Sequence, residues 1–178
     1  MQRLSGRQKS VDKERADAPQ VKIRAMRAED LNDVVEIERL SFPTPWSRYA
    51  FLSELYQNSR SCYLVAELDG RVVGYVGTWL ILDEAHITNL AVHPDFRKRG
   101  IAYSLMLLLF DICRSKQIRR MTLEVRATNF PAQRLYEKLG FVKVGVRRGY
   151  YHDNNEDAII MWKEDLGQNT GTHVIKLL

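Results

Sequence analysis

Apolar and polar residues alternate with two different periods between residues 21 and 166. A two-residue period predicts β-strands, and a period near 3.6 residues predicts amphipathic helices. In chain order we expect strands at 21–26, 62–68, 71–82, 85–92, 121–125, 141–150 and 157–162, and helices at 28–40, 48–56, 100–116 and 131–139. This order, with a strong hairpin signal at Asp69-Gly70, predicts an α/β fold in which helices pack on a mixed sheet.

The fourth strand-like run, residues 85–92, departs from simple alternation. Its first two apolar residues, Ala85 and Ile87, keep one parity, whereas its last two keep the other. An extra residue at a β-bulge would produce this slip, because it reverses which side chains face the core. A strand that is buried on both faces explains the pattern equally well. We treat the bulge as a hypothesis, with Thr88 and Asn89 as its site.

The segments outside residues 21–166 show no apolar period of their own. Residues 1–20 are polar and carry both charge signs, which is typical of a flexible leader, and residues 167–178 resemble a C-terminal tail. The strongest apolar run, Leu105–Phe110, is far shorter than the roughly 20 residues that cross a bilayer, and no signal-peptide apolar region precedes it. We therefore expect one cytoplasmic domain with two tails and no membrane partner.

Composition supports a folded chain and leaves several kinds of partner open. The chain is 45% hydrophobic and 28% charged, which is ordinary for a globular protein. Its net charge of +5 favours a polyanionic ligand, and nucleic acid, a ribosomal surface and a phosphate-rich cofactor all fit. Cys62 and Cys113 are far apart and lack the spacing of a zinc or redox pair, and the histidines are scattered, so we predict no metal site.

A basic segment, residues 97–102, joins the bulged strand to the most amphipathic helix. The first amides of a helix have no intrahelical partner and, with the positive end of the helix dipole, attract phosphate. Gly100 would let an anion approach the backbone, and Arg97, Lys98 and Arg99 would add long-range attraction. No Walker A or GxGxxG pattern is present. The segment therefore predicts a phosphate site that is not of those two types.

Three stretches resemble a known family. The pattern R-x-x-G-x-A at residues 97–102 resembles motif A of the GNAT acetyltransferase superfamily, although Ala102 stands where glycine is frequent. Residues 123–129 (LEVRATN) and 134–141 (RLYEKLGF) are similar to the RimI-type protein N-terminal acetyltransferases, and this match is the more specific one. The resemblance covers residues 21–162. It implies a mostly antiparallel sheet of about seven strands, flanked by about four helices and splayed at a bulged fourth strand.

The resemblance also implies acetyl-coenzyme A as co-substrate and gives its contacts. A strand backbone would pair with the pantetheine arm, loop amides would hold the pyrophosphate, and an asparagine would touch the coenzyme. The residues at these positions are Leu90, Ala91, Val92, Arg97, Lys98, Arg99, Gly100, Ile101, Ala102, Tyr103 and Asn129.

Two further positions match the family's catalytic groups. Glu124 stands where the family has its proton acceptor, and Tyr136 stands where it has its proton donor. An α-ammonium has a pKa of about 7.7 to 8.0, so a carboxylate that acts directly or through water has only a modest task in freeing the amine. Without the flanking motif, Glu124 would be interpreted as a solvent-facing charge and Tyr136 as packing.

Two aromatic segments could line an acceptor site across the splay. They contain Phe42 and Trp46 in one loop and Tyr150 and Tyr151 in another. Aromatic residues on loops often form protein-binding surface. Capping of the core by Trp46 and Tyr150 explains the same residues equally well.

The resemblance implies an N-acetyltransferase that acts on the α-amino group of a protein N-terminus, either the alanine of a ribosomal protein or a broader set. One alternative keeps the coenzyme and changes the acceptor to a lysine side chain or a small amine. A second alternative is a non-catalytic acyl-coenzyme A sensor or RNA-associated module on the same fold. The joint presence of Glu124 and Tyr136 favours an active enzyme, and we expect no direct contact with nucleic acid.

Overall fold

The computed structural model describes residues 21–166. The predicted leader (1–20) and tail (167–178) lie outside the described residues. The strands are β1 (Lys22–Ala25), β2 (Ser61–Leu68), β3 (Arg71–Ile81), β4 (Glu84–Val92), β5 (Arg120–Arg126), β6 (Val142–Tyr151) and β7 (Glu156–Lys163). The helices are α2 (Leu31–Ser41), α3 (Arg48–Tyr56), α4 (Ile101–Ser115) and α5 (Phe130–Lys138), with 3₁₀ turns η1 (Ala28–Asp30) and η2 (Pro94–Phe96). All eleven expected elements are present within a few residues of their predicted bounds.

The strands form one seven-stranded sheet in the order β1-β2-β3-β4-β5-β7-β6. Neighbouring strands are antiparallel except β4 and β5, which are parallel. The turn between β2 and β3 is Asp69-Gly70, and both residues have positive φ (51° and 79°), as a tight hairpin requires. The predicted mixed, mostly antiparallel α/β sheet is confirmed.

The predicted bulge in β4 is present. Asn89 pairs with Gly77 of β3, but the next pair is Ile87 with Thr78, so Thr88 is the extra residue. Apolar side chains before and after the slip belong to the same core cluster, which is why the alternation changes parity. The alternative is also correct in part, because Ala91, after the slip, is buried in the core on the opposite face.

A tyrosine on β2 holds the bulge in place. The ring of Tyr63 crosses Gly77 so closely that a Cβ atom at that position would lie 2.2 Å from it. The phenol oxygen lies 3.2 Å from Oγ1 of Thr88 and forms a hydrogen bond with it. Glycine on β3 thus allows a side chain from β2 to reach the extra residue of β4.

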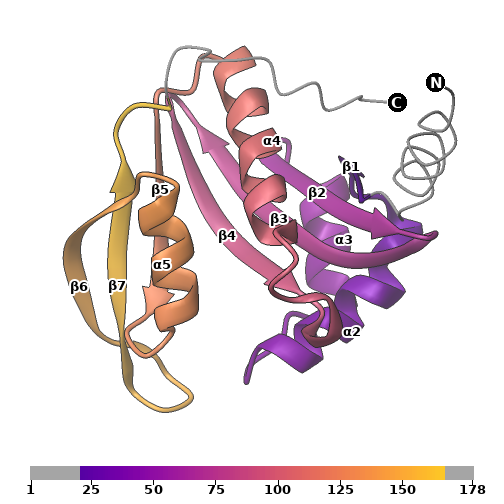
Figure 1. Ribbon diagram of the computed structural model, residues 1–178, viewed down its shortest axis with the longest axis horizontal. Coiled ribbons are helices and arrows are strands. Elements are labelled where there is room, and N and C mark those ends of the chain that lie inside the picture. The colour runs from indigo at the N-terminus through magenta and orange to yellow at the C-terminus, as the bar shows by residue number, and fades with distance from the viewer. Residues whose placement is uncertain (1–20, 167–178) are drawn as a thin grey trace, which may run out of the picture.

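The sheet splays beyond the bulge. The parallel pairing covers only Glu84–Ile87 of β4 with Arg120–Leu123 of β5, and the two strands then run apart (Figure 1). The edge of residues 88–92 that faces away from β3 is therefore not bonded to β5. The sheet has two arms, β1–β4 and β5-β7-β6, which meet at this point.

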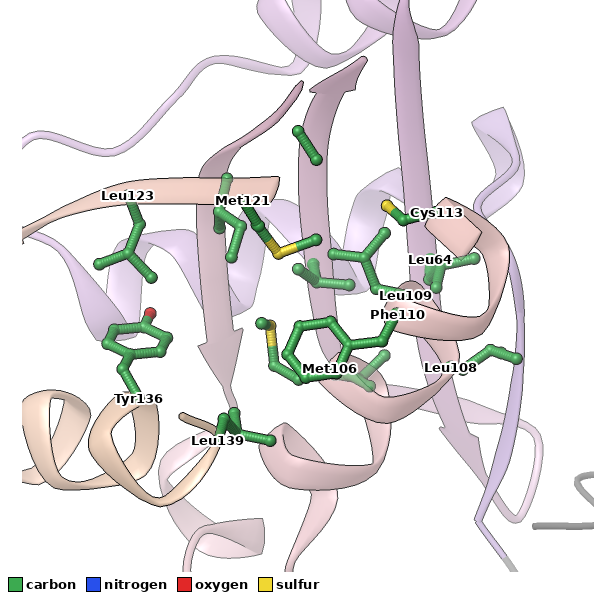
Figure 2. Close-up of a cluster of buried hydrophobic side chains, with 14 of the residues drawn as sticks. Leu64, Met106, Leu108, Leu109, Phe110, Cys113, Met121, Leu123, Tyr136 and Leu139 are labelled. Carbon is green, nitrogen blue, oxygen red and sulfur yellow. The ribbon is translucent and has the colours of Figure 1, made fainter. Parts of the chain in front are cut away.

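Helices cover the two arms unequally. Helices α4 and α5 lie on one face of the sheet, and α2 and α3 lie on the other face of the first arm (Figure 1). The larger core forms under α4 and α5 (Figure 2), and a smaller one under α2 and α3 is centred on Phe51 and Tyr75. Among the described helices, none covers the second face of β5, β7 and β6 (Figure 1).

None of the helices within residues 21–166 combines the length and apolar character needed to cross a membrane.

Candidate active site

The basic loop between η2 and α4 turns sharply at two residues. Lys98 and Gly100 both have positive φ, 62° and 79°. A Cβ atom added to Gly100 would meet no other atom within 4 Å, so glycine at this exposed position serves the backbone conformation and not the packing. The loop therefore presents its main chain to solvent at the start of α4.

The first amides of α4 point out of the helix end. The first helical hydrogen bond runs from the Ser104 amide to the Gly100 carbonyl (2.9 Å), so the amides of Ile101, Ala102 and Tyr103 precede it. They lie at the positive end of a fifteen-residue helix. This arrangement has the geometry of the anion site that the sequence predicts.

The three cations of the loop differ in what they touch. Nε of Arg97 donates to the Val92 carbonyl (2.9 Å), and its Nη2 donates to Oγ of Ser41 (3.0 Å). Arg99 folds back onto the loop, where its Nη2 donates to the Asp95 carbonyl (3.0 Å). Arg97 thus binds the loop to its surroundings and Arg99 binds the loop to itself, and all three cations are exposed.

The other predicted coenzyme residues lie along the splay. Leu90 pairs with Val76 of β3 and packs against the larger core, while Ala91 faces the smaller core on the opposite side. Asn129 is exposed at the start of α5, where its side-chain oxygen accepts from the Ala132 amide (3.2 Å). Capping uses that oxygen, so the side-chain nitrogen is the group that remains for a ligand.

The side chains of Glu124, on β5, and Tyr136, on α5, lie on opposite faces of β5. Glu124 is the first residue of β5 after the parallel pairing with β4 ends at Leu123. Its neighbours Leu123 and Val125 point into the larger core, so Glu124 points to the face that no described helix covers. Tyr136 lies in the larger core, and its ring stands between α5 and Leu123 with the hydroxyl directed towards β5 (Figure 2).

Burial determines the state of the Tyr136 phenol. The side chain is 7% exposed, and its ring packs edge-on against Phe141 with centroids 5.8 Å apart. Desolvation, with a smaller contribution from Tyr151, raises its pKa well above the usual range of a phenol. The hydroxyl therefore keeps its proton under ordinary conditions.

Glu124 belongs to a cluster of polar and aromatic groups on the uncovered face. Nη1 of Arg147 lies 3.1 Å from Oε1 of Glu124, and the same guanidinium stacks 5.4 Å from the ring centre of Tyr150. The Tyr150 and Tyr151 rings meet edge-on at 5.2 Å. Burial raises the pKa of Tyr151 to about 12, nearby Arg126 opposes this rise, and Glu124 is among the groups that add to it. The charge of Glu124 therefore reaches the Tyr151 phenol.

Arg126 fixes the β6–β7 hairpin that carries these tyrosines. Its guanidinium lies 3.9 Å from the Tyr151 ring centre and pairs with Asp153 (2.8 Å) and Glu156 (3.0 Å). Glu156 also accepts from the hydroxyl and amide of Thr128, and these bonds, followed by the one from Arg126, lower its pKa to about 2. Tyr151 is therefore held by an ionic network.

The sequence did not predict Arg147. A register shift between Lys143 and Gly145 inserts an extra residue into β6, so simple alternation does not tell which face the later residues occupy. β6 is also an edge strand with exposed side chains on both faces, and the usual apolar signal is weak there.

Phe42 and Trp46 lie on the other arm. Both pack against the smaller core, and the Trp46 ring lies 5.5 Å from Phe51. Across residues 21–166, no hydrogen bond, ion pair or ring contact joins either residue to Glu124 or Tyr151. Trp46 thus takes part in packing, whereas Tyr150 is 40% exposed.

Within residues 21–166, no group of His, Cys, Asp and Glu side chains could hold a metal ion.

A sheet that splays at a bulged strand, with a helix start beside the splay, defines the α/β fold of an acyl-group transferase. The chain belongs to the acetyltransferase (GNAT) family, whose model matches residues 31–141. It is 46% identical over 140 residues to a Bacillus subtilis protein provisionally named ribosomal protein bS18-alanine N-acetyltransferase, covering 79% of this chain and 93% of the relative.

Two further comparisons agree with this assignment. The Escherichia coli ribosomal protein bS18-alanine N-acetyltransferase is 36% identical over 141 residues, covering 78% of this chain and 94% of the relative. The crystal structure of the ribosomal-protein-S18-alanine N-acetyltransferase from Escherichia coli superposes with a TM-score of 0.75 and 33% identity, covering 86% of this chain and 99% of that one. The predicted family, fold class and acetyltransferase activity are confirmed.

Proposed function

We propose that this enzyme transfers the acetyl group of acetyl-coenzyme A to the α-amino group of a protein N-terminus, with the N-terminal alanine of ribosomal protein bS18 as the favoured acceptor. The observation that carries the proposal is the position of Glu124. It is the first residue after the β4–β5 pairing ends, on the uncovered face, while the amides of α4 lie at the other side of the splay. Names of the relatives support the choice of acceptor.

The main chain of this enzyme would hold the coenzyme. The outward amides of Ile101, Ala102 and Tyr103 suit a pyrophosphate, and the open space over Gly100 admits it. The edge of residues 88–92 that is not bonded to β5 suits an amide-bearing arm. When bound, acetyl-coenzyme A supplies a thioester carbon that an amine can attack.

Two side chains would move the protons. Glu124, directly or through water, takes a proton from the acceptor's ammonium, so that the neutral nitrogen can form its bond to the acetyl carbon. Tyr136 donates its hydroxyl proton to the sulfur as the carbon–sulfur bond breaks, and the second proton that the nitrogen loses in becoming an amide returns through solvent to the Tyr136 phenolate. The products are the acetylated N-terminus and free coenzyme A. The uncovered face at Glu124 suits a chain end, because no described helix blocks it.

Mass spectrometry of a peptide with the alanine-starting bS18 N-terminus tests this function. We expect acetyl-coenzyme A-dependent acetylation at the α-amine. The matched control is the same peptide with a blocked N-terminus and an internal lysine. Acetylation of lysine alone would support the side-chain alternative, and saturable binding of acetyl-coenzyme A without any transfer would support the sensor.

A further inference from the structure

A buried carboxylate lies on the arm opposite Glu124. Glu38 of α2 is completely buried, and no cation pairs with it among the described residues. Three groups donate hydrogen bonds to it: the Trp46 amide to Oε2 (2.7 Å), the Tyr75 phenol to Oε1, and the Asn89 side-chain amide to Oε1 (3.4 Å). Packing alone does not explain a carboxylate at this position, because burial of a charge costs free energy that an apolar side chain of similar size would not cost.

The three donors come from separate parts of the fold. Trp46 ends the loop of residues 42–46, Tyr75 is on β3, and Asn89 lies beside the bulge of β4. Oδ1 of Asn89 is buried and has no hydrogen-bond partner within residues 21–166, so within these residues the Asn89 side chain is held by its hydrogen bond to Glu38. One carboxylate thus connects loop 42–46 to the strand that borders the splay.

The other end of the same loop is also fixed. The Phe42 amide donates to the main-chain carbonyl of Glu38 (2.9 Å), and the preceding residue, Ser41, accepts from Arg97 of the basic loop (3.0 Å). Loop 42–46 is therefore held at both ends, by the main chain and by the side chain of one residue. Its middle, Pro43 to Pro45, is exposed.

We propose that Glu38 is a positioning residue for the acceptor: by binding the Trp46 amide and the Asn89 side chain together, it sets the place of loop 42–46 relative to the bulge of β4. This inference rests on the proposed function, since it assigns that loop to the acceptor. Within residues 21–166, Glu38 forms no hydrogen bond with the amides at the start of α4 or with the main chain of residues 88–92, because its bond to Asn89 is to the side chain. Loss of the carboxylate should therefore change acceptor binding and leave coenzyme binding intact.

Glu38→Gln tests the inference, because it keeps the side-chain volume and removes the charge and one acceptor oxygen. We expect the KM for the alanine-starting peptide to rise about tenfold, as for loss of one hydrogen bond to a charged group. The KM for acetyl-coenzyme A should stay within about twofold, since the α4 amides are untouched. Amide hydrogen exchange at Trp46 should become faster, which reports on the loop itself. Glu36→Gln is the matched control, because Glu36 lies on the same helix but pairs with Arg71 on the surface.

Tyr75→Phe provides a second variant if Glu38→Gln does not fold. It removes one donor to the carboxylate and leaves the Trp46 bond, so a smaller rise in peptide KM is expected, again without a change for the coenzyme. An unchanged peptide KM in a folded Glu38→Gln enzyme overturns the inference, as does an equal change for both substrates. Failure of the parent enzyme to acetylate the peptide would instead count against the proposed function, so the two failures can be told apart.

Discussion

The guanidinium of Arg147 lies 3.1 Å from the Glu124 carboxylate, so a cation from the edge strand β6 neutralises the proposed general base. The Arg147 side chain is 54% exposed and that of Glu124 is 28% exposed. Ion pairs with this degree of exposure contribute only about 0 to 1 kcal/mol. The pair can therefore exchange one cation for another, and an acceptor's ammonium is the cation that the proposed reaction brings to this carboxylate.

Arg147→Gln should lower the KM for an alanine-starting peptide by about two- to fivefold, which is the range that an exposed ion pair allows. Glu124 would then have no internal cation to exchange for the incoming ammonium. The measurement is initial-rate kinetics at saturating acetyl-coenzyme A. Arg148→Gln is the control, since Arg148 is next in sequence but pairs with Asp157. A higher KM for Arg147→Gln would mean that the arginine itself binds the acceptor.

Glu124→Gln should reduce kcat by about 10²- to 10⁴-fold, the usual contribution of a general base. Glutamine preserves the shape of the side chain but cannot take up a proton. Calorimetric binding of acetyl-coenzyme A should be unchanged, because the coenzyme residues lie elsewhere. Glu137→Gln is the matched control, because that glutamate forms a comparable surface pair with Lys143. A kcat near the parent value would remove Glu124 from the mechanism.

Tyr136→Phe should lower kcat by about 10²-fold or more while the fold is kept. The phenylalanine ring can maintain the edge-on contact with Phe141, and only the hydroxyl is lost. Burial raises the pKa of Tyr136, so the phenol is still protonated at about pH 8, where the acceptor amine becomes neutral. The kcat and the melting temperature should be measured together. An active variant with normal stability would assign this tyrosine to packing.

The apolar periodicity was enough to predict most strands and helices of residues 21–166, because these elements bury at least one face against a core, whereas the edge strand β6 carries only a weak apolar signal. Parity suggested a bulge at Thr88 or Asn89 but not which of the two is the extra residue, and the strand pairing shows that it is Thr88. The start of the predicted helix 28–40 is instead a 3₁₀ turn, in which Asp30 accepts from the Arg27 amide and from Arg24. That ion pair joins residues on two elements, so local pattern did not reveal it.

The site could be predicted only where a motif marks it. Glu124 and Tyr136 lie in a recognisable stretch, whereas the partners that surround them come from distant segments. Arg147 lies on the irregular edge strand β6, and Glu38 occupies a position on α2 that helical periodicity assigns to the core. Sequence pattern predicts that such a position is buried, but it does not predict which buried donors will meet the side chain.

Gly100→Ala should weaken the coenzyme site through the backbone. At a φ of 79°, an alanine costs about 1 to 2 kcal/mol relative to glycine, although its Cβ would meet no other atom. The loop should shift to relieve this strain, and the KM for acetyl-coenzyme A should rise more than the KM for peptide. Gly145→Ala is the control, because its Cβ would make an ordinary 3.6 Å contact with Ile160 and its φ is not positive. Equal effects of the two variants would contradict a special role for residue 100.

Glu38 should make stability depend on pH near neutrality. Burial, opposed by hydrogen bonds from Trp46 and Asn89, raises the pKa of this carboxyl from 4.5 to about 7. The folded protein thus holds the proton more tightly than the unfolded chain. The contribution to stability is complete below pH 4.5 and is lost as pH rises towards 7. Tyr63 and Tyr75 are the titratable groups that face it from β2 and β3.

Urea unfolding of the parent enzyme and of Glu38→Gln at pH 5 and pH 8 measures this effect. The free energy of unfolding of the parent, relative to the variant, should fall by about 2 to 3 kcal/mol between the two pH values. Groups that both proteins contain titrate in the same way, so their contributions cancel in the difference. Asp30 is one such group: its burial opposes the shift, and its hydrogen bonds with Arg24 and Arg27 lower its pKa overall. A difference that does not change with pH would show that Glu38 is ionised, or protonated, over the whole range, and its three donors would then have to stabilise a single charge state.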